Sequence, residues 1–248
     1  MITNNDGIPS EDFSDFKKIE FQFEGRDAIL VCPDEEIKTR KWLLKTEYFA
    51  AFPGLEVEML KRGWHVAYLK NTNRWGLDED MDAKKAFAGF LNEKYGLYEK
   101  CVPVGMSAGG LHAIKLAAKY PEMVSSLYLD APLLNILSCL NLAGTSIPNE
   151  ALKEEVLSAL NLTLSELISY REHPLDKLPA LLASRIPVVL VYGSNDNIVP
   201  FHENGALLVK AYEHTGIDLE VYSKDCGHHP HCLDDPTQII DFILRHAE

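Results

Sequence analysis

The segment Val102–Gly110 (V-P-V-G-M-S-A-G-G) constrains the fold of this chain more than any other stretch. An apolar, strand-like run precedes it at Cys101–Val104, and a helix-like run follows it at Leu111–Lys119. The G-x-S-x-G pattern between them places a glycine two residues before and two residues after Ser107, because only small residues fit beside a sharp strand-to-helix turn. The segment therefore predicts a serine hydroxyl at the tip of a strand, above the N-terminus of a helix.

The remainder of the chain alternates between strand-like and helix-like stretches. Apolar strands are predicted at Phe16–Phe23, Ala28–Cys32, Trp64–Leu69, Val124–Leu129, Pro187–Tyr192 and Asp218–Ser223. Helices are predicted at Trp42–Lys61, Glu79–Tyr95, Asn204–Thr215 and Thr237–His246. Such alternation indicates an α/β fold, with a mostly parallel central sheet flanked by helices.

The stretch 133–182 interrupts this alternation, because it contains no convincing strand. Three helices are predicted within it, at Asn149–Leu160, Thr163–Tyr170 and Asp176–Ser184. We expect a helical insertion that covers the sheet as a lid; the alternative is a set of helices that only pack on it. Residues 13–248 are thus predicted to form a single α/β domain, preceded by a polar, flexible N-terminus at 1–12.

A serine hydroxyl is a weak nucleophile, and it needs a base that is itself oriented by an acid. Two later loops offer such groups at the ends of predicted strands. Asp196 lies in G-S-N-D-N-I-V-P, and His228 lies in K-D-C-G-H-H-P-H. Because the chain order serine, acid, histidine is the one expected for a serine on this kind of turn, we predict Ser107 as the nucleophile, Asp196 as the acid and His228 as the base.

Neighbouring residues leave two of these roles open. His229 and His231 are rival bases, and Asp130 is a rival acid because it ends the strand after the serine turn. Pro230 biases the preceding residue toward an extended conformation. We therefore expect the side chain of His229 to face away from that of His228.

The histidine-rich loop also has a composition that can bind zinc, because Cys226 and Cys232 flank its three histidines. Neither an H-E-x-x-H motif nor a C-x-x-C pair accompanies them, and one histidine already serves the serine. The sequence therefore predicts no metal ligands.

The chain resembles the α/β-hydrolase superfamily from about Phe16 to His246. The motifs that carry this resemblance are G-M-S-A-G-G, Y-G-S-N-D-N-I-V-P and G-H-H-P-H. The last of them, followed by Asp234-Asp235-Pro236, resembles a subgroup of serine esterases that is often linked to acylated carbohydrates. The resemblance implies hydrolysis through an acyl-enzyme on the serine, without a cofactor.

The resemblance also implies an oxyanion hole made of two backbone N–H groups. One belongs to Ala108, directly after the serine. The other is expected just after the strand Ala28–Cys32, where Pro33 has no N–H and Asp34 is the better candidate. The H-G-G-G run that many lipases carry there is missing.

Trp42, Arg74 and Trp75 are candidate substrate-binding residues, because they lie in or near loops expected at the active-site end of the sheet. A tryptophan at that place can stack on a sugar ring, or it can belong to an apolar patch under the lid.

Composition limits the partners of this protein. The formal net charge of −13 argues against nucleic acid and anionic membranes as binding partners. No signal peptide or apolar transmembrane stretch is visible, and the five cysteines are widely spread. We therefore expect a cytoplasmic protein with reduced thiols, whose oligomeric state the sequence leaves open.

These observations predict a serine hydrolase that cleaves carboxylic esters of small molecules or carbohydrates. A peptidase and a thioesterase are alternatives, because all three reactions share one acyl-transfer site. A non-catalytic binding module is a further alternative, because a fold alone does not establish a function.

Overall fold

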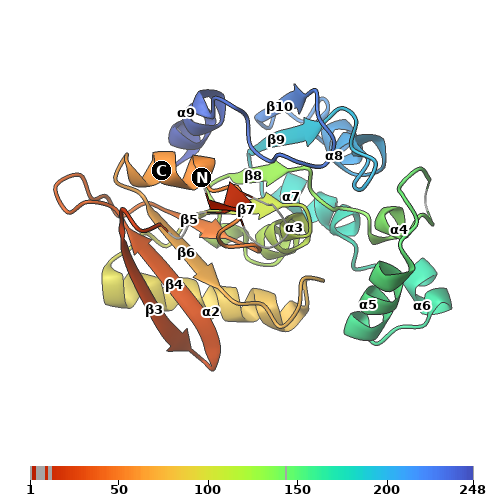
Figure 1. The fold of residues 1–248 in the computed structure, drawn as a ribbon, viewed down its shortest axis with the longest axis horizontal. Helices are drawn as coiled ribbons and strands as arrows, with labels where there is room; N and C mark the ends of the chain where they lie inside the picture. Colours follow the sequence, from red (N-terminus) through yellow and green to blue (C-terminus); the bar gives the residue numbers. More distant parts are fainter. Residues whose placement is uncertain (1, 4–8, 11–12, 143, 248) are drawn as a thin grey trace.

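An eight-stranded sheet forms the centre of the computed structural model, which describes residues 2–3, 9–10, 13–142 and 144–247. Its strands are β3 (Lys17–Phe23), β4 (Arg26–Cys32), β5 (Trp42–Lys45), β6 (His65–Leu69), β7 (Val102–Met106), β8 (Leu127–Asp130), β9 (Val188–Gly193) and β10 (Leu219–Lys224). They lie in the order β10-β9-β8-β7-β5-β6-β4-β3 (Figure 1). Strand β4 is antiparallel to both of its neighbours, and the other pairs are parallel. The predicted α/β fold with a mostly parallel sheet is confirmed.

Helices cover both faces of this sheet. They are α1 (Gly54–Leu60), α2 (Asp78–Tyr95), α3 (Gly109–Lys119), α7 (Leu178–Ala183), α8 (Gly205–Tyr212) and α9 (Thr237–His246). One face packs against α2, α3, α7 and α8, and the other packs against α1 and α9. Successive strand residues point to opposite faces, so that Leu43 joins one core and Leu44 the other. Burial on both faces explains why the interior strands β5, β7, β8 and β9 are mostly apolar, whereas the edge strands β3 and β10 are partly exposed.

Two short strands, β1 (Ile2–Thr3) and β2 (Pro9–Ser10), pair with each other in antiparallel fashion. The other residues of the segment 1–12, which the sequence predicts to be flexible, lie outside the described residues. Within the ranges that the structure describes, no helix combines the length and the apolar composition needed to cross a membrane.

The predicted helix Trp42–Lys61 is wrong over its first half. Trp42–Lys45 is strand β5, which lies between β6 and β7 with all four residues buried. A loop follows, in which Tyr48 and Phe52 have positive φ angles, and helix α1 begins only at Gly54. The apolar run Trp42–Leu44 is buried on both faces of the sheet, and so short a run has no periodicity that distinguishes a strand from a helix.

The insertion consists of α4 (Ile136–Cys139), α5 (Glu150–Leu160) and α6 (Leu164–Ser169), which stand beside the sheet and share their own small core (Figure 1). The third predicted helix, Asp176–Ser184, corresponds to a short 3-10 turn and α7. Leu178 and Leu181 of α7 pack into the main core with α3. The end of the stretch 133–182 is therefore part of the helical layer on the sheet, and the insertion itself ends with α6.

A buried ion pair joins β5 to α1 beneath the serine turn. Lys45 Nζ lies 2.5 Å from Glu56 Oε1 and also donates to the carbonyl oxygen of Ala51, and neither charged side chain is exposed to solvent. The same nitrogen lies 3.2 Å from the sulfur of Met106, the residue before the serine. The pair therefore holds the loop after β5 and the end of β7 in register.

Replacing Glu56 with alanine is expected to lower the free energy of unfolding by about 3–5 kcal/mol, because Lys45 is left buried without a counter-charge. Glu58→Ala on the same helix is the matched control. Its carboxylate pairs with Lys61 and Arg62 at the surface, where such a pair contributes about 0–1 kcal/mol. Urea denaturation of both variants measures the difference, and equal losses would contradict the structural role of the buried pair.

Candidate active site

Ser107 occupies the turn between β7 and α3, in the strand–turn–helix arrangement that the sequence predicts. Its φ angle is +50°, a conformation that is uncommon for a residue with a side chain. Backbone hydrogen bonds hold it there: its N–H donates to the carbonyl of Asp130, and its own carbonyl accepts from the N–H groups of Gly110 and Leu133, each at 2.9 Å. At Gly105 a Cβ atom would lie 2.8 Å from the Cβ of Ala113, so a larger residue would push α3 away from the strand.

The structure brings Ser107, His228 and Asp196 together from three separate loops. Ser107 Oγ lies 2.9 Å from His228 Nε2, and His228 Nδ1 lies 2.7 Å from Asp196 Oδ2. The other oxygen of Asp196 accepts hydrogen bonds from the backbone N–H groups of Ile198 and Val199, each of 2.9 Å. The aspartate is thereby held with one oxygen facing the imidazole, and both it and the histidine are buried.

The loop after β9 carries Asp196 (the acid loop), and the loop after β10 carries His228 (the histidine loop). Backbone hydrogen bonds link these two loops. The N–H of Ser194 donates to the carbonyl of Lys224, and the N–H of Asn195 donates to the carbonyl of Cys226. At Gly193 a Cβ atom would lie only 2.0 Å from the carbonyl oxygen of Gly227, so no other residue fits there without moving the backbone. Parallel pairing of β9 and β10 therefore continues beyond the sheet and aligns the two loops.

Asp130, the rival acid, contacts His231 and not His228. One of its oxygens lies 2.8 Å from His231 Nδ1, and the other accepts from the N–H of Cys232 at 2.5 Å and from the hydroxyl of Tyr128 at 2.6 Å. Burial alone would raise the pKa of Asp130. The nearby His231 and these hydrogen bonds outweigh that effect, so the pKa of Asp130 lies below its usual value. Asp130 thus remains ionised and anchors the histidine loop to the end of β8.

His229 does not face away from His228, contrary to expectation. Its ring centroid lies 4.8 Å from that of His228, and its ring stacks on Phe52 at 5.2 Å. The sequence argument assumed extended backbone, whereas this loop is a succession of bends, in which neighbouring side chains need not alternate. Partial burial, together with the nearby imidazoles of His228 and His231, lowers the pKa of His229 to about 4.

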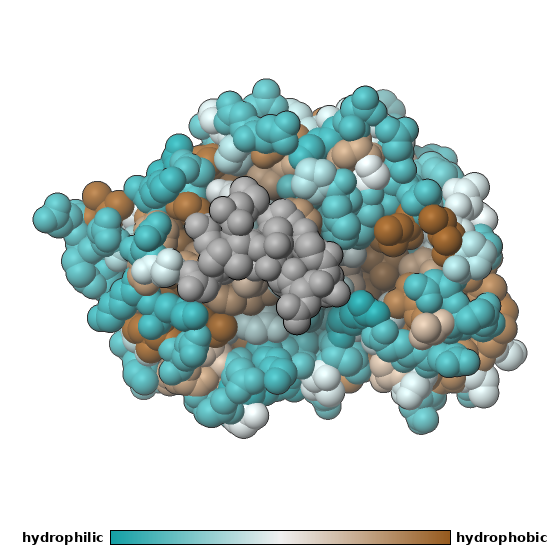
Figure 2. Space-filling model, viewed as in Figure 1, coloured by the Kyte–Doolittle hydropathy of each residue, from teal (hydrophilic) through white to brown (hydrophobic). Residues whose placement is uncertain are grey.

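A cavity of about 550 Å³ opens beside Ser107. Figure 2 shows a hollow with hydrophobic walls between the sheet and helices α4 and α5. Apolar side chains supply most of its lining, namely Ala51, Phe52, Trp75, Met106, Ala108, Leu133, Leu152, Ile198 and Val199. Cys139, Asn149 and Leu152 come from the insertion, which therefore forms one wall of the cavity. Whether this wall moves as a lid stays a prediction.

Arg74 and Trp75, two of the candidate substrate-binding residues, line this cavity and contact the insertion. Arg74 Nε donates to a carboxylate oxygen of Glu155 on α5 at 2.8 Å, and the indole N–H of Trp75 donates to the same oxygen at 3.0 Å. The hydrogen bonds from Arg74 lower the pKa of Glu155. The charge of Arg74 is thus matched by a carboxylate, and the contact holds α5 against the loop after β6.

Trp42, the third candidate substrate-binding residue, does not lie at the site. It is only 1% exposed, and its indole N–H donates to the carbonyl of Tyr98. It begins β5, whereas Ser107 lies beyond the end of the parallel neighbour β7, so the two are at opposite edges of the sheet. Trp42 is a core residue, and its assignment to substrate binding is wrong.

Asp34 is likewise placed at the wrong edge to complete an oxyanion hole. It follows β4, which is antiparallel to β6 and pairs Val31 with Val66 near the beginning of β6. The end of β4 therefore lies opposite the edge at which β7 presents Ser107. The prediction fails because β5, which lies next to β7 and ends at the correct edge, was mistaken for helix.

The loop that follows β5 is the functional segment that sequence reasoning missed. Tyr48 lines the cavity together with Ser107 and Ala108. The Thr46 hydroxyl lies 2.8 Å from the carbonyl oxygens of Val104 and Gly109, on either side of the serine, and donates its one proton between them. The short apolar run Trp42–Leu44, bounded by Lys41 and Lys45, is the signal by which the strand before this loop could have been found.

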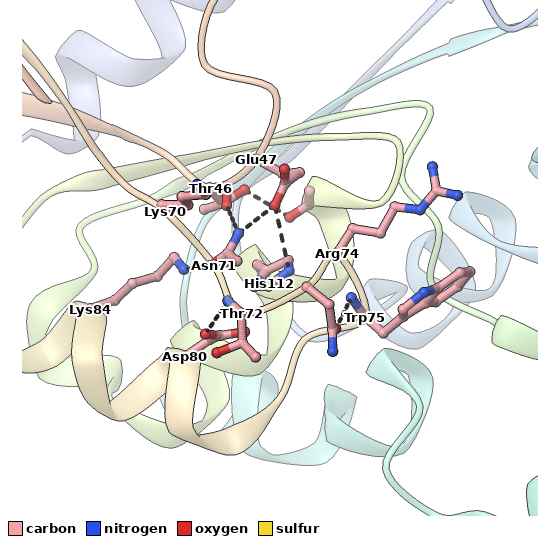
Figure 3. Close-up of polar contacts among 12 residues, drawn as sticks. Thr46, Glu47, Lys70, Asn71, Thr72, Arg74, Trp75, Asp80, Lys84 and His112 are labelled. Carbon is pink, nitrogen blue, oxygen red and sulfur yellow. Dashed lines mark hydrogen bonds and ion pairs between the residues drawn. The ribbon is translucent and has the colours of Figure 1, made fainter. Parts of the chain in front are cut away.

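Polar side chains brace this loop from behind (Figure 3). Asn71 lies between the loop and helix α2, and its amide nitrogen donates to the carbonyl of Thr46 at 2.7 Å and to Glu47 Oε2 at 2.5 Å. The amide oxygen of Asn71 accepts from the ammonium group of Lys84, whose burial lowers its pKa to about 8. The network fixes the backbone beside the serine without entering the cavity.

Comparison with known proteins supports this architecture. No protein-family model matches the chain. The acylamino-acid-releasing enzyme of Mus musculus is 29% identical over 130 residues, which are 52% of this chain and 17% of that protein. The present chain thus corresponds to less than a fifth of that relative.

Two solved structures have a similar fold. An acylaminoacyl peptidase of Pyrococcus horikoshii superposes with a TM-score of 0.69 and 14% identity, covering 94% of this chain and 42% of its own. The esterase Pf2001 of Pyrococcus furiosus superposes with a TM-score of 0.65 and 16% identity, covering 100% of this chain and 98% of its own. At this level of identity the two likenesses show a shared fold.

Proposed function

The chain has the α/β-hydrolase fold, and we propose that it is a serine hydrolase that cleaves carboxylic esters. The observation that carries the proposal is the continuous contact from Ser107 through His228 to Asp196, beside a cavity large enough for a small molecule. Neither contact exceeds 2.9 Å, so a proton can pass from the hydroxyl to the imidazole without rearrangement of the loops.

In the proposed reaction, Ser107 Oγ attacks the acyl carbon while its proton moves to His228 Nε2. Asp196 accepts the hydrogen bond from Nδ1–H and stabilises the imidazolium that forms. The imidazolium then protonates the leaving alkoxide, and an acyl-enzyme remains on the serine. Water, activated by the same imidazole, releases the carboxylic acid and restores the hydroxyl. No step requires a cofactor.

The developing oxyanion is proposed to bind at the start of α3. Ala108 immediately precedes this helix, and the first N–H groups of a helix lack partners within it. The second donor is proposed to come from the loop after β5, because Tyr48 of that loop shares the cavity with Ser107 and Ala108. We therefore assign the second oxyanion-hole donor to this loop and no longer to Asp34.

The lining of the cavity favours an ester with an apolar acyl group. Leu133, Leu152, Ile198 and Val199 offer aliphatic surface next to the serine, and the charge of Arg74 is already paired. Stacking on a sugar ring has weaker support, because Trp42 lies elsewhere and Trp75 is only 2% exposed. Small-molecule esters are therefore our first choice, and acylated carbohydrates are the second.

Amide or thioester cleavage is the second candidate function. The solved relatives reported above include an acylaminoacyl peptidase, and the mouse relative is named for the release of acylated amino acids. The same serine, base and oxyanion donors serve all three reactions. An acyl-enzyme site that cleaves an amide also cleaves an ester of the same acyl group, because the ester carbonyl is more electrophilic and an amide nitrogen must be protonated before it can leave.

A substrate panel tests the proposal. The protein is assayed with p-nitrophenyl esters of increasing acyl length, acetylated sugars, thioesters and acylaminoacyl p-nitroanilides, and it is labelled in parallel with a fluorophosphonate. We expect labelling of Ser107 and the largest kcat/KM among the aryl esters. Hydrolysis of the acylaminoacyl p-nitroanilides would identify a peptidase, and its absence beside ester hydrolysis would identify an esterase. If the protein is not labelled and hydrolyses none of these substrates, it is a binding protein and not an enzyme.

A further inference from the structure

Three imidazole rings lie close together in the lining of the cavity. The ring centroids of His228, His229 and His231 are 4.8, 5.0 and 5.1 Å apart, and one potential ligand atom from each lies within 4.8 Å of the others. A tetrahedral zinc ion with Zn–N distances of about 2.0–2.1 Å holds the centroids of its imidazole ligands about 5 Å apart. The rings are therefore already spaced as such a site requires, although the nitrogens must still turn toward one point.

Two of these histidines carry the support that zinc ligands usually have. The Nδ1 atoms of His228 and His231 lie 2.7 and 2.8 Å from the buried carboxylates of Asp196 and Asp130. A ligating histidine commonly donates its other ring N–H to a carboxylate, which fixes the tautomer and leaves Nε2 to bind the metal. The two carboxylates also supply negative charge that balances a divalent cation.

His229 is suited to be the third ligand. Its side chain is exposed, and it lines the same cavity as the other two histidines.

From this geometry we propose that His228, His229 and His231 form a zinc site that inhibits the enzyme. Zinc would take the Nε2 lone pair of His228, which in the proposed reaction accepts the proton of Ser107. The serine Oγ, 2.9 Å from that nitrogen, is near enough to be the fourth ligand. Inhibition rests on the proposed function, whereas metal binding does not.

The donor set also selects the metal. Imidazole nitrogen suits zinc and related transition metals, whereas magnesium and calcium prefer oxygen ligands. Zinc chloride is therefore expected to inhibit hydrolysis of an aryl ester reversibly, with recovery on addition of EDTA. Magnesium chloride at the same concentration is the control, and it should leave the rate unchanged.

His229→Gln separates metal binding from catalysis, because His229 contacts neither Ser107 nor Asp196 in the proposed triad. Because His229 lines the cavity, the zinc response of this variant is measured relative to its own rate without zinc. Its half-inhibitory zinc concentration should rise by about tenfold or more, because one of three ligands is lost. His202→Gln removes an exposed histidine elsewhere and should keep the wild-type zinc response. Unchanged inhibition of His229→Gln would overturn the proposal.

A second measurement does not depend on activity. Ser107→Ala should bind one zinc ion per chain in equilibrium dialysis and give the visible absorption of tetrahedral cobalt when Co²⁺ replaces zinc. Adding His229→Gln to this variant should abolish both signals. Metal binding without any ester hydrolysis by the wild type would refute the proposed function and leave the site intact. Active wild-type enzyme together with no bound metal would refute the site.

Discussion

Replacing Ser107 with alanine is expected to lower kcat/KM for aryl-ester hydrolysis by about 10⁴-fold or more, while the protein remains folded. The substitution removes a single oxygen whose neighbours are His228 Nε2 and the cavity. The backbone hydrogen bonds that hold the turn do not involve that oxygen, so they persist. Loss of the nucleophile leaves only the oxyanion donors and binding to accelerate the reaction.

Ester hydrolysis and thermal unfolding of the same preparation measure this effect. Ser165→Ala, at an exposed position of α6 in the insertion, is the matched control and should match the wild type in both. If Ser107→Ala keeps activity within about tenfold of wild type, Ser107 is not the nucleophile.

Replacing His228 with glutamine is expected to slow acylation by an activated ester by about a thousandfold or more, because no other ring nitrogen among the described residues contacts the serine hydroxyl. His229→Gln should acylate at nearly the wild-type rate. His231→Gln should have an intermediate effect, because it breaks a hydrogen bond to Asp130 that anchors the histidine loop. Stopped-flow measurement of p-nitrophenol release under single-turnover conditions reports the acylation step directly.

The two aspartates provide an independent check on this assignment. Asp196→Asn should cost far more acylation rate than Asp130→Asn, because only Asp196 contacts the imidazole that faces the serine. Suppose instead that His228→Gln acylates at the wild-type rate, that His231→Gln is inactive, and that Asp130→Asn is more damaging than Asp196→Asn. The base would then be His231 and the acid Asp130.

Features with a local physical cause could be predicted from the sequence. The turn around Ser107 needs small residues at fixed offsets, and the flanking strand and helix follow from the apolar pattern. Asp196 and His228 were found by combining chain order with the rule that parallel strands end at one edge of the sheet. The closing helix Thr237–His246 has the predicted bounds, because its apolar residues recur with helical periodicity.

Other features depend on which strand lies beside which. The sequence Trp42–Lys45 is compatible with either a short buried helix or a short buried strand. Only its pairing with β6 and β7 in the sheet makes it a strand. That one choice decides the neighbours of the serine. Because β5 is a strand next to β7, the loop that contains Tyr48 lies at the site, whereas Trp42 and Asp34 lie at the opposite edge of the sheet.

The sequence by itself determined the turn that presents Ser107 and the order in which its partners follow, because these depend on backbone sterics and on the direction of parallel strands. Only the tertiary structure decided which histidine of a three-histidine loop faces the serine. There, Asp196 from the loop after β9 meets His228, and Asp130 at the end of β8 meets His231. Side-chain direction within an irregular loop has no periodicity, so contacts from distant strands settle it.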